Sequence, residues 1–285
     1  MTRYGTVEIG GTKTDVGVGS SPDDLDRERI PTTDPETTLG AVIEFFAGMD
    51  LPAVGVGAFG PLDLDRRSPR FGSLRSTPKP GWSGTPLLEI LTGGLNAPVI
   101  LDTDVNAAAL GEGRWGATQG MADHVYVTVG TGIGAGIVVA GSPISHREHP
   151  EAGHVPVRRK TGDRLDGVCA YHGDCLEGLA SGPALERRFG PPVTWPGNQE
   201  VVDLCSHYLA QGLAVLVYTV APERIVIGGG VARLPGLHDR VRIDLAGRLA
   251  GYPGEPDLDL LVSKPGLGDL SGLAGGLVLA ESAGR

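Results

Sequence analysis

The sequence predicts an α/β protein of two domains, and three observations support this prediction. The chain has 285 residues, about twice the length of a typical domain. Hydrophobic residues make up 40% of it, which is enough for each domain to bury a core. Segments with the period of two that is typical of strands alternate along the chain with segments of helical spacing, and this order favours an α/β architecture.

The first half begins with two alternating segments, Tyr4–Ile9 and Thr14–Gly19, which are separated by Gly10-Gly11-Thr12-Lys13. Glycine allows the chain to reverse between them, so we expect a hairpin. Asp34 is followed by Pro35 and an acidic residue, which is the pattern of a capped helix start, and apolar residues continue at helical spacing to residue 46. The other elements expected in this half are a strand at 53–59, a strand at 99–102 and a helix that begins near residue 104.

A long segment rich in Pro, Gly and Arg, residues 61–84, separates two of these strands. It is too long for a simple connection in a compact domain. Ordered loops of this length often line functional sites, so we expect this one to lie near a ligand.

The opening pattern recurs about 120 residues later. Val125–Val129 and Ile133–Val139 are again strand-like, and Gly130-Thr131-Gly132 separates them. This similarity suggests that the chain consists of two related halves. The elements expected after the second hairpin are helices at 176–189 and 201–220, a strand at 224–227, a helix at 235–249, a strand at 258–262 and a helix at 270–282.

The composition argues against several classes of protein. Lys and Arg number 24 and Asp and Glu number 34, which gives a formal charge of −10 and disfavours a protein that coats nucleic-acid phosphates or an anionic membrane. No secretory signal pattern opens the chain, no window approaches about 18 consecutive apolar residues, and the cysteines are too few for a secreted disulfide framework. We therefore expect a cytoplasmic protein that binds neither nucleic acid nor membranes.

Four glycine-rich turns follow predicted strands. They are Gly10-Gly11-Thr12-Lys13, Gly130-Thr131-Gly132, Gly228-Gly229-Gly230 and Gly266-Leu267-Gly268. Glycine lets backbone N–H groups approach a phosphate closely because no Cβ intervenes. One such turn is more often purely structural, but four at strand ends predict a site for a phosphorylated ligand. None has the spacing of a P-loop, and none fits a dinucleotide fingerprint well.

Asp104 is the candidate catalytic base. It follows the predicted strand at 99–102 and begins a helix, so a helix cap is the alternative interpretation, and Asp102 is the nearest rival position. Phosphoryl transfer to an alcohol needs a carboxylate that accepts the hydroxyl proton, while Mg²⁺ and amide donors hold the γ-phosphoryl group. The glycine turns supply such amide donors, and this favours the catalytic interpretation.

A polar segment, residues 145–176, contains a metal-binding pattern. Cys169, His172 and Cys175 are spaced three residues apart, and His154 lies fifteen residues before the first of them. A two-residue spacer lets successive ligands face one ion, and Cys2His2 is a common closed zinc set. The alternatives are a Cys169–Cys175 disulfide, which a reducing compartment disfavours, and incidental buried thiols. Four protein ligands leave no open position, so zinc would organise the loop and would not itself catalyse.

Two carboxylates flank this pattern. Glu151 precedes His154, and Glu177 follows Cys175. If zinc folds the segment, both carboxylates are brought to one locality, where they could accept hydrogen bonds from sugar hydroxyls. The alternative is that both are ordinary surface acids.

Taken together, these motifs resemble the ROK family of sugar kinases and are most similar to its bacterial fructokinase branch. The likeness runs from Val7 to about Gly276. It rests on EIGGTK at 8–13, TPKPGW at 77–82, DTDVNAAALGE at 102–112, GTGIGAG at 130–136, HPEAGH at 149–154 and YHGDCLEGLASGP at 171–183. The resemblance implies a two-lobed fold of duplicated ribonuclease-H-like domains, as in actin, hexokinases and Hsp70. The lobes would be residues 1–115, completed by a helix at 270–285, and residues 116–269, which include the zinc segment at 145–176.

The resemblance also implies roles for individual residues. Asp104 would be the general base. ATP would contact Gly10, Gly11, Thr12, Lys13, Thr131, Gly132, Pro183, Gly228, Gly229 and Gly230. The sugar would contact Thr103, Asp104, Glu151 and Glu177. His154, a sugar contact in the family, is assigned first to structural zinc together with Cys169, His172 and Cys175. Mg²⁺ would be required, and a homodimer is expected.

Two positions depart from the family pattern. Glu8 stands where many relatives with this fold carry Asp, although the fructokinase-like branch tolerates Glu, and this bears on how Mg²⁺ is held. Thr103 stands where glucokinases of the family usually carry Asn, which favours a ketohexose or mannose over glucose.

The expected function is therefore that of an ATP- and Mg²⁺-dependent fructokinase that makes fructose 6-phosphate. One alternative is a kinase of the same family that acts on mannose or an N-acetylated amino sugar. Another is a sugar-responsive regulator, but family regulators carry a DNA-binding module before the kinase-like part, and only nine residues precede Gly10. A catalytically silent, zinc-stabilised binding protein is the third, and the intact glycine turns disfavour it.

Overall fold

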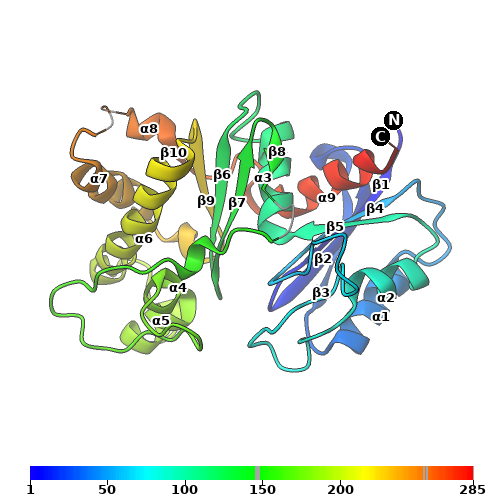
Figure 1. Ribbon diagram of the computed structural model, residues 1–285, viewed down its shortest axis with the longest axis horizontal. Coiled ribbons are helices and arrows are strands. Elements are labelled where there is room, and N and C mark those ends of the chain that lie inside the picture. The colour runs from blue at the N-terminus through cyan, green and yellow to red at the C-terminus, as the bar shows by residue number, and fades with distance from the viewer. Residues whose placement is uncertain (145–147, 253, 255, 285) are drawn as a thin grey trace.

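Two five-stranded mixed sheets form the framework of the molecule (Figure 1). The computed structural model describes residues 1–144, 148–252, 254 and 256–284. The strand order is β3-β2-β1-β4-β5 in the first sheet and β10-β9-β6-β7-β8 in the second. When the second sheet is followed from β8 to β10, it has the same order and the same strand directions as the first, followed from β3 to β5. Each half is therefore built on the same strand plan.

The first sheet begins with the predicted hairpin. Its strands are β1 (Tyr4–Ile9), β2 (Lys13–Gly19), β3 (Asp26–Pro31), β4 (Val54–Ala58) and β5 (Val99–Thr103). β1 pairs antiparallel with β2, and β1, β4 and β5 run parallel, so their carboxyl ends lie at one edge of the sheet. The helices α1 (Pro35–Phe45) and α2 (Leu87–Gly94) belong to this half. The predicted start of α1 is confirmed, because the Asp34 side chain accepts a hydrogen bond from Thr37 N at 2.9 Å.

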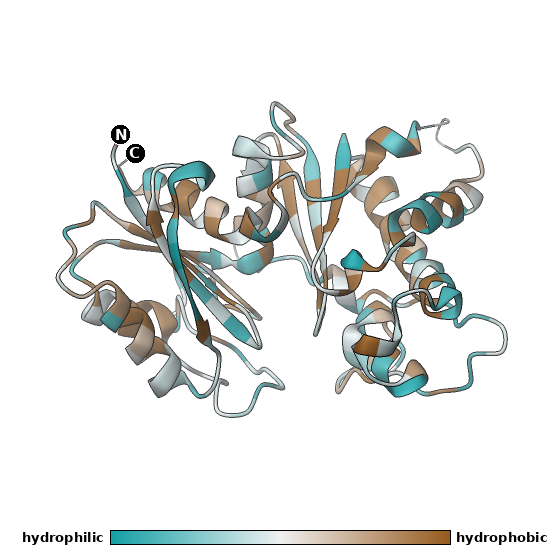
Figure 2. Cartoon of the chain, turned by 180° about the vertical axis from the view of Figure 1, so that it is seen from behind, coloured by the Kyte–Doolittle hydropathy of each residue, from teal (hydrophilic) through white to brown (hydrophobic). Residues whose placement is uncertain are grey.

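The second sheet carries a more extensive helical cover. Its strands are β6 (His124–Val129), β7 (Ile133–Val139), β8 (Ser142–Pro143), β9 (Arg224–Gly228) and β10 (Val262–Ser263). Its helices are α4 (Leu176–Ala180), α5 (Gly182–Phe189), α6 (Gln199–Val220), α7 (Leu237–Leu249) and α8 (Leu258–Leu261). Short 3-10 helices lie at Pro22–Asp24, Ala152–His154, Pro192–Thr194, Val231–Arg233, Gly268–Leu270 and Ser282–Gly284. Apolar residues are concentrated on the strands and on the inner faces of the helices (Figure 2).

α6 is the longest helix of the described chain. Its 22 residues are long and apolar enough to cross a membrane by length and composition, but 67% of its apolar window is buried inside the molecule. Tyr208 and Cys205 on this helix are fully buried in the core of the second half. α6 is therefore a core helix of that half.

Two helices connect the halves by an exchange. α3 (Asp104–Trp115) follows β5 but packs against β6 and β7, whereas α9 (Ser271–Glu281) follows β10 and packs against β1 and β4. The two helices also pack against each other between the sheets (Figure 1). A Cβ added at Gly275 would overlap the carbonyl oxygen of Ala107, so the helices approach as closely as they do because glycine lies at the contact.

A buried carboxylate joins the two segments that cross between the halves. Glu112, on α3, is 0% exposed. Its carboxylate accepts hydrogen bonds from Ala117 N at 2.7 Å, just after α3, and from Gly266 N at 2.9 Å and Leu267 N at 3.1 Å, just before α9. It also accepts one from Ser271 Oγ at 2.6 Å. A buried carboxylate with this many donors fixes the two crossing segments to each other.

The structure differs from the predicted elements in several places. β3 was not expected, because its side chains are almost all exposed and show no apolar alternation. Residues 258–262 are mainly the short helix α8, and only Val262 and Ser263 pair as a strand. The helix expected at 176–189 is divided at Ser181, whose backbone is extended, because Pro183 has no N–H to donate to the preceding turn and fits only in the first turn of a new helix, α5. Residues 145–147 of the predicted zinc segment and residue 285 of the closing helix lie outside the described residues.

Candidate active site

Asp104 lies where β5 ends and α3 begins, at the edge shared by β1, β4 and β5. Thr103 is the residue that caps the helix, with its hydroxyl accepting from Asn106 N at 3.2 Å. Asp104 Oδ1 accepts from Val105 N at 2.9 Å. Loss of surrounding water raises the pKa of Asp104 to about 6, with backbone hydrogen bonds acting in the opposite direction. Asp104 is thus not the helix cap, and its raised pKa suits a group that accepts a proton near neutral pH.

The rival carboxylate, Asp102, has a structural environment. It is 8% exposed, and its Oδ1 accepts from Thr103 N at 2.7 Å and from Asn106 Nδ2 at 2.8 Å. These bonds hold the end of β5 against the first turn of α3. Asp102 therefore orients the segment that carries Asp104.

Glu8 is the second buried carboxyl at this edge. It lies near the end of β1, two residues before the first glycine turn begins at Gly10, and packs against Gly272 of α9. Burial raises the pKa of Glu8 to about 7, Lys13 opposes the shift, and the negative charge of Asp104 adds to it. A buried carboxyl that lies within electrostatic range of another carboxyl is suited to binding a cation.

The first glycine turn connects β1 to β2. Gly10 N donates to Lys13 O at 2.9 Å, and Gly11 and Thr12 are exposed. Lys13, predicted to contact ATP, directs its ammonium to Asp15 Oδ2 at 3.1 Å. A second lysine holds the turn: Lys79 Nζ donates to Gly11 O at 2.7 Å. Lys79 belongs to the TPKPGW motif, but no local sequence pattern predicted that it would contact this turn.

The second glycine turn connects β6 to β7 and is held from two sides. Ile133 N donates to Glu177 Oε2 at 2.9 Å, and Gly182 N donates to Gly130 O at 2.7 Å. Gly182 is followed by Pro183 in the first turn of α5. The structure therefore places Thr131 and Gly132 beside Glu177 and Pro183.

The turn after β9 lies against the second glycine turn. Gly229 has a φ of +91°, and a Cβ there would lie 2.7 Å from Val129 N. A Cβ on Gly130 would approach Gly230 N at 3.9 Å. Because only glycine has both the positive φ and the space, Gly228 to Gly230 can lie directly beside Gly130. The predicted nucleotide residues of this half are thus neighbours in space.

The four predicted metal ligands form one cluster. Their ligand atoms on His154, Cys169, His172 and Cys175 all lie within 4.8 Å of one another. His154 Nδ1 is 3.6 Å from Cys169 Sγ and 3.5 Å from Cys175 Sγ, and His172 Nδ1 is 3.8 Å from Cys169 Sγ. A tetrahedral zinc site with bonds of about 2.3 Å to sulfur and 2.0 Å to nitrogen requires an S···N separation of about 3.5 Å. The donor set therefore fits Zn²⁺.

The disulfide alternative is wrong for the described chain, because all three cysteines are free thiols. Cys205 lies elsewhere, fully buried on α6. Cys175 additionally caps α4, since its Sγ accepts from Gly178 N at 3.4 Å. The cluster and the helix that carries Glu177 thus share one residue.

Glu151 and Glu177 lie at the same locality as the cluster. The His154 ring presents Nδ1 to the thiols and Nε2 toward Glu151 Oε2 at 4.0 Å. Burial raises the pKa of Glu151 to about 7, and the negative charges of Glu177 and Asp104 add to the shift. These electrostatic contributions show that Glu151 lies within reach of both Glu177 and Asp104. His154 therefore faces the cluster with Nδ1 and Glu151 with Nε2.

The long loop at 61–84 contacts the segment that precedes the cluster. His149 Nε2 accepts from Leu62 N at 3.0 Å, and Arg75 Nη1 lies 3.1 Å from Glu148 Oε1. Tyr171 Oη lies 3.3 Å from Ser76 Oγ. The expectation that this loop lies near the candidate site agrees with these contacts and with the bond from Lys79.

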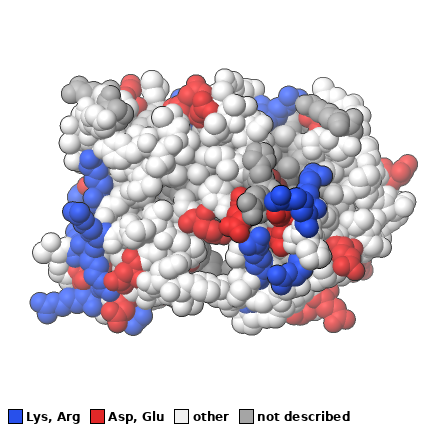
Figure 3. Space-filling model, in the orientation of Figure 1, with Lys and Arg blue, Asp and Glu red and all other residues white. Residues whose placement is uncertain are grey.

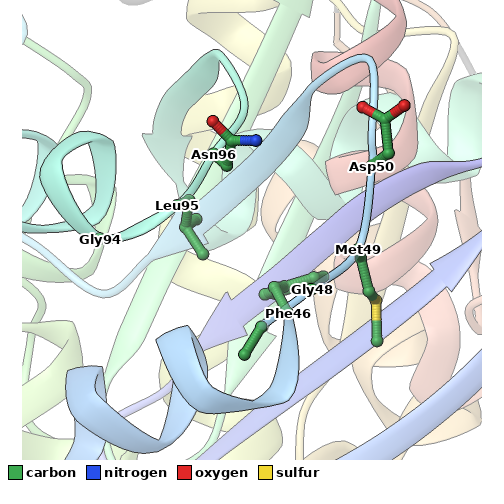
Figure 4. A pocket seen from close by; sticks show the side chains of 8 residues that line it. Phe46, Gly48, Met49, Asp50, Gly94, Leu95 and Asn96 are labelled. Carbon is green, nitrogen blue, oxygen red and sulfur yellow. The ribbon is translucent and has the colours of Figure 1, made fainter.

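On the face shown in Figure 3, Lys and Arg gather along the left edge and again right of the centre, and acidic side chains lie next to both groups. A pocket of about 240 Å³ lies apart from the candidate site, where α1 and α2 end (Figure 4). It is lined by residues 46–50 and 94–96, which include none of the predicted site residues. The candidate site is therefore not this pocket; it consists of the buried carboxyls and the glycine turns described above.

Comparison with known proteins gives one consistent result. The model of the ROK family matches residues 4–283. The chain is 41% identical to a fructokinase of Zymomonas mobilis, with 98% of this chain and 97% of that protein covered. It is 38% identical to a fructokinase of Pediococcus pentosaceus, with 98% of each covered.

Solved structures give the same picture. A ROK hexokinase from Thermus thermophilus matches with a TM-score of 0.78 and 31% identity over 99% of each chain. A ROK family glucokinase from Streptomyces griseus, in complex with glucose and AMPPNP, matches with a TM-score of 0.80 and 27% identity over 98% of this chain and 99% of that one. The predicted fold is confirmed by these likenesses.

Proposed function

Because the chain belongs to the ROK family, we propose that it is an ATP-dependent fructokinase that phosphorylates the primary hydroxyl of fructose to give fructose 6-phosphate. The observation that carries this proposal is the position of Asp104. Its half-buried carboxyl, with a pKa raised to about 6, lies within electrostatic reach of Glu8 beside the first glycine turn and of Glu151 beside the metal cluster. The fructokinases among the similar proteins support fructose as the sugar.

Asp104 acts as the general base. At neutral pH a carboxyl with a pKa near 6 is mostly ionised, yet it binds a proton more strongly than an ordinary aspartate. It accepts the proton of the sugar hydroxyl as the hydroxyl oxygen forms a bond to the γ-phosphorus of ATP. The bond between that phosphorus and the β,γ-bridging oxygen breaks, and ADP leaves with the electron pair.

The two glycine turns bind the nucleotide. Gly11 and Thr12 offer backbone N–H groups and a hydroxyl on one side of the phosphates, and Thr131 and Gly132 do so on the other. Gly10 closes the first turn, because its N–H is used by Lys13 O. Pro183 and Gly228 to Gly230 lie next to the nucleotide. Lys13 contributes positive charge, although its ammonium is engaged by Asp15.

Mg²⁺ supplies neutralisation of the charge on the transferring phosphoryl group when it is bound. Glu8 is the residue that would hold it. This assignment is supported by the negative charges that face Glu8 and by its place beside the first glycine turn.

Zn²⁺ would be held by His154, Cys169, His172 and Cys175. Four protein ligands close the coordination sphere, so its contribution is structural. It would fix the segment that carries Glu151 and the N-terminus of α4, which carries Glu177. His154 Nε2 is left facing Glu151, the arrangement in which a ligating histidine is oriented by a carboxylate partner.

The sugar contacts Glu151, Glu177 and Asp104, with Thr103 next to the base. Carboxylates accept hydrogen bonds from several hydroxyls at once, and this suits a polyhydroxylated substrate. Residues 1–115 with the closing helix, and residues 116–269, would act as two lobes that close on sugar and nucleotide and exclude water. Association into a homodimer is part of the same proposal.

A coupled assay tests this function. The purified chain would be given ATP, Mg²⁺ and, separately, fructose, mannose, glucose and N-acetylmannosamine, with ADP release measured for each. We expect the highest kcat/KM with fructose and phosphate on carbon 6 of the product by NMR. Higher kcat/KM for another sugar would replace fructose by that sugar, and the absence of ADP release with every sugar would overturn the kinase proposal.

A further inference from the structure

Lys79 connects the long loop to the first glycine turn. Its ammonium donates to Gly11 O at 2.7 Å and to Thr32 O at 3.2 Å. The side chain is half-buried. Gly11 belongs to the turn between β1 and β2, and Thr32 follows β3, so one cation joins two segments of the first sheet from outside it.

The loop around Lys79 is held firmly on both sides. Trp82 is 0% exposed, and its indole Nε1 donates to Thr33 O at 2.7 Å. Thr77 N donates to Ser83 Oγ at 3.0 Å. The Phe59 ring packs edge-on against Trp82 with centroids 5.2 Å apart. Because anchors lie before and after it, the Lys79 ammonium is placed by the fold and does not have to be ordered when a ligand arrives.

The bond to Gly11 O determines the direction of the next N–H group. The peptide between Gly11 and Thr12 is planar, so fixing its carbonyl toward Lys79 points the Thr12 N–H the opposite way. Thr12 O is held as well, since it accepts from Thr32 N at 3.1 Å. A Cβ built on Gly11 would meet nothing within 4 Å, which means that open space adjoins the turn.

We propose that Lys79 is a positioning residue for nucleotide binding, which orients the Gly11–Thr12 peptide so that its N–H meets the phosphates of ATP. This inference rests on the proposed function, because it takes the first glycine turn to be a phosphate site. Two of the three ammonium protons of Lys79 are used by Gly11 and Thr32. The positive charge also lies beside a site that must hold a triphosphate.

The test compares nucleotides with and without phosphates. Binding of Mg²⁺-AMPPNP and of adenosine would be measured by calorimetry for the wild type, Lys79→Met, Lys79→Arg and Arg67→Met. Arg67 is a matched control, because it is an exposed cation of the same loop that pairs with Asp65 within the loop. We expect Lys79→Met to weaken AMPPNP binding about tenfold or more, to leave adenosine binding within about twofold, and to be partly rescued by Lys79→Arg.

Steady-state kinetics give a second measurement. In Lys79→Met, the KM for ATP should rise and kcat should fall, while the KM for fructose stays within about twofold of the wild type. Equal loss of AMPPNP and adenosine binding would show that Lys79 only stabilises the loop, and unchanged AMPPNP binding would overturn the inference.

The outcome is separable from that of the proposed function. If the wild type binds AMPPNP but phosphorylates none of the sugars, the choice of reaction fails and the calorimetric comparison still decides the role of Lys79. If Lys79→Met binds AMPPNP as the wild type does while fructose is phosphorylated normally, the positioning role fails and the fructokinase proposal stands.

Discussion

The two glycine turns have the same place in their sheets but are held by opposite kinds of group. The turn between β1 and β2 is fixed through a carbonyl, by the Lys79 ammonium. The turn between β6 and β7 is fixed through an N–H at Ile133 by the Glu177 carboxylate, and through a carbonyl by the backbone of Gly182. Glu177 is also a candidate sugar ligand on a helix that Cys175 caps. Glu177 therefore links the proposed sugar site and the metal cluster directly to the second turn, whereas the first turn is connected to the cluster segment only through the loop at 61–84.

The two glycine turns have the same backbone form, but the groups that hold them couple them to different parts of the molecule. The first turn is adjusted by a loop of its own half, so changes there should affect the nucleotide alone. The second turn shares Glu177 with the proposed sugar site, so changes there should affect the binding of nucleotide and sugar together. Substitutions, metal removal and a change of pH test this contrast.

The largest effect is expected at Asp104, which belongs to neither turn. Asp104→Asn removes the proton acceptor and keeps the size of the side chain, so kcat should fall by roughly 10²- to 10⁴-fold. The melting temperature and AMPPNP affinity should stay close to those of the wild type, because both turns are intact. Turnover like that of the wild type would remove Asp104 from the reaction and leave the turns as a binding site without a base.

Loss of the metal should disturb the second turn selectively. Zinc chelation, or Cys175→Ser, should lower the melting temperature by roughly 5–10 °C and raise the KM for fructose. The metal content would be measured by mass spectrometry on the same samples. Cys205→Ser is the control, because that buried thiol lies outside the cluster. A melting temperature and a turnover that are both indifferent to chelator would contradict the structural-zinc proposal.

The pH profile should reflect Asp104. Its pKa is raised in the folded chain to about 6, so below that pH it is protonated and kcat/KM should fall at least about tenfold per unit. Glu8 and Glu151, whose pKa values are raised to about 7, ionise in the neighbouring range, so the plateau should begin only above about pH 8. The sign for stability is opposite: a carboxyl whose folded pKa is raised binds protons more readily when folded, so its contribution to unfolding free energy grows as the pH falls from about 6 toward 4. Asp104→Asn should remove this contribution, which thermal unfolding across pH would show.

The smallest effects are expected from a matched pair of glycine substitutions. A Cβ on Gly11 meets nothing within 4 Å, whereas a Cβ on Gly132 would lie 2.7 Å from Glu177 Oε2. Gly11→Ala should keep unfolding free energy within about 0.5 kcal/mol and weaken ATP binding by a few-fold. Gly132→Ala should cost about 1–2 kcal/mol and raise the KM for fructose as well. Identical behaviour of the two variants in thermal unfolding and kinetics would show that the turns are equivalent.

Local chemistry made much of this site predictable. Hairpins with glycine turns, the capped start of α1 and the ligand spacing of the metal cluster depend on neighbours in sequence, and the structure has each of them. β3 was missed because it lies at the sheet edge with charged side chains in solvent, so it carries no apolar period. Residues 258–262 were misread because a short apolar run does not distinguish strand from helix.

Contacts between distant residues were beyond sequence reasoning. Lys79 and Gly11 are 68 residues apart, and Glu177 and Ile133 are 44 apart. In neither case does the spacing or the residue type reveal the partner. Glu112 ends the motif at 102–112, but its four hydrogen-bond donors come from two segments that approach it only in the folded chain.

The exchange of α3 and α9 makes the halves mutually dependent for their stability. Each sheet is covered by a helix that the chain delivers from the other half, and the two helices are in contact along their length. Heat or denaturant should therefore melt both halves in one cooperative transition, even though each has its own core. A ligand that binds to one half should therefore raise the unfolding free energy of the whole molecule.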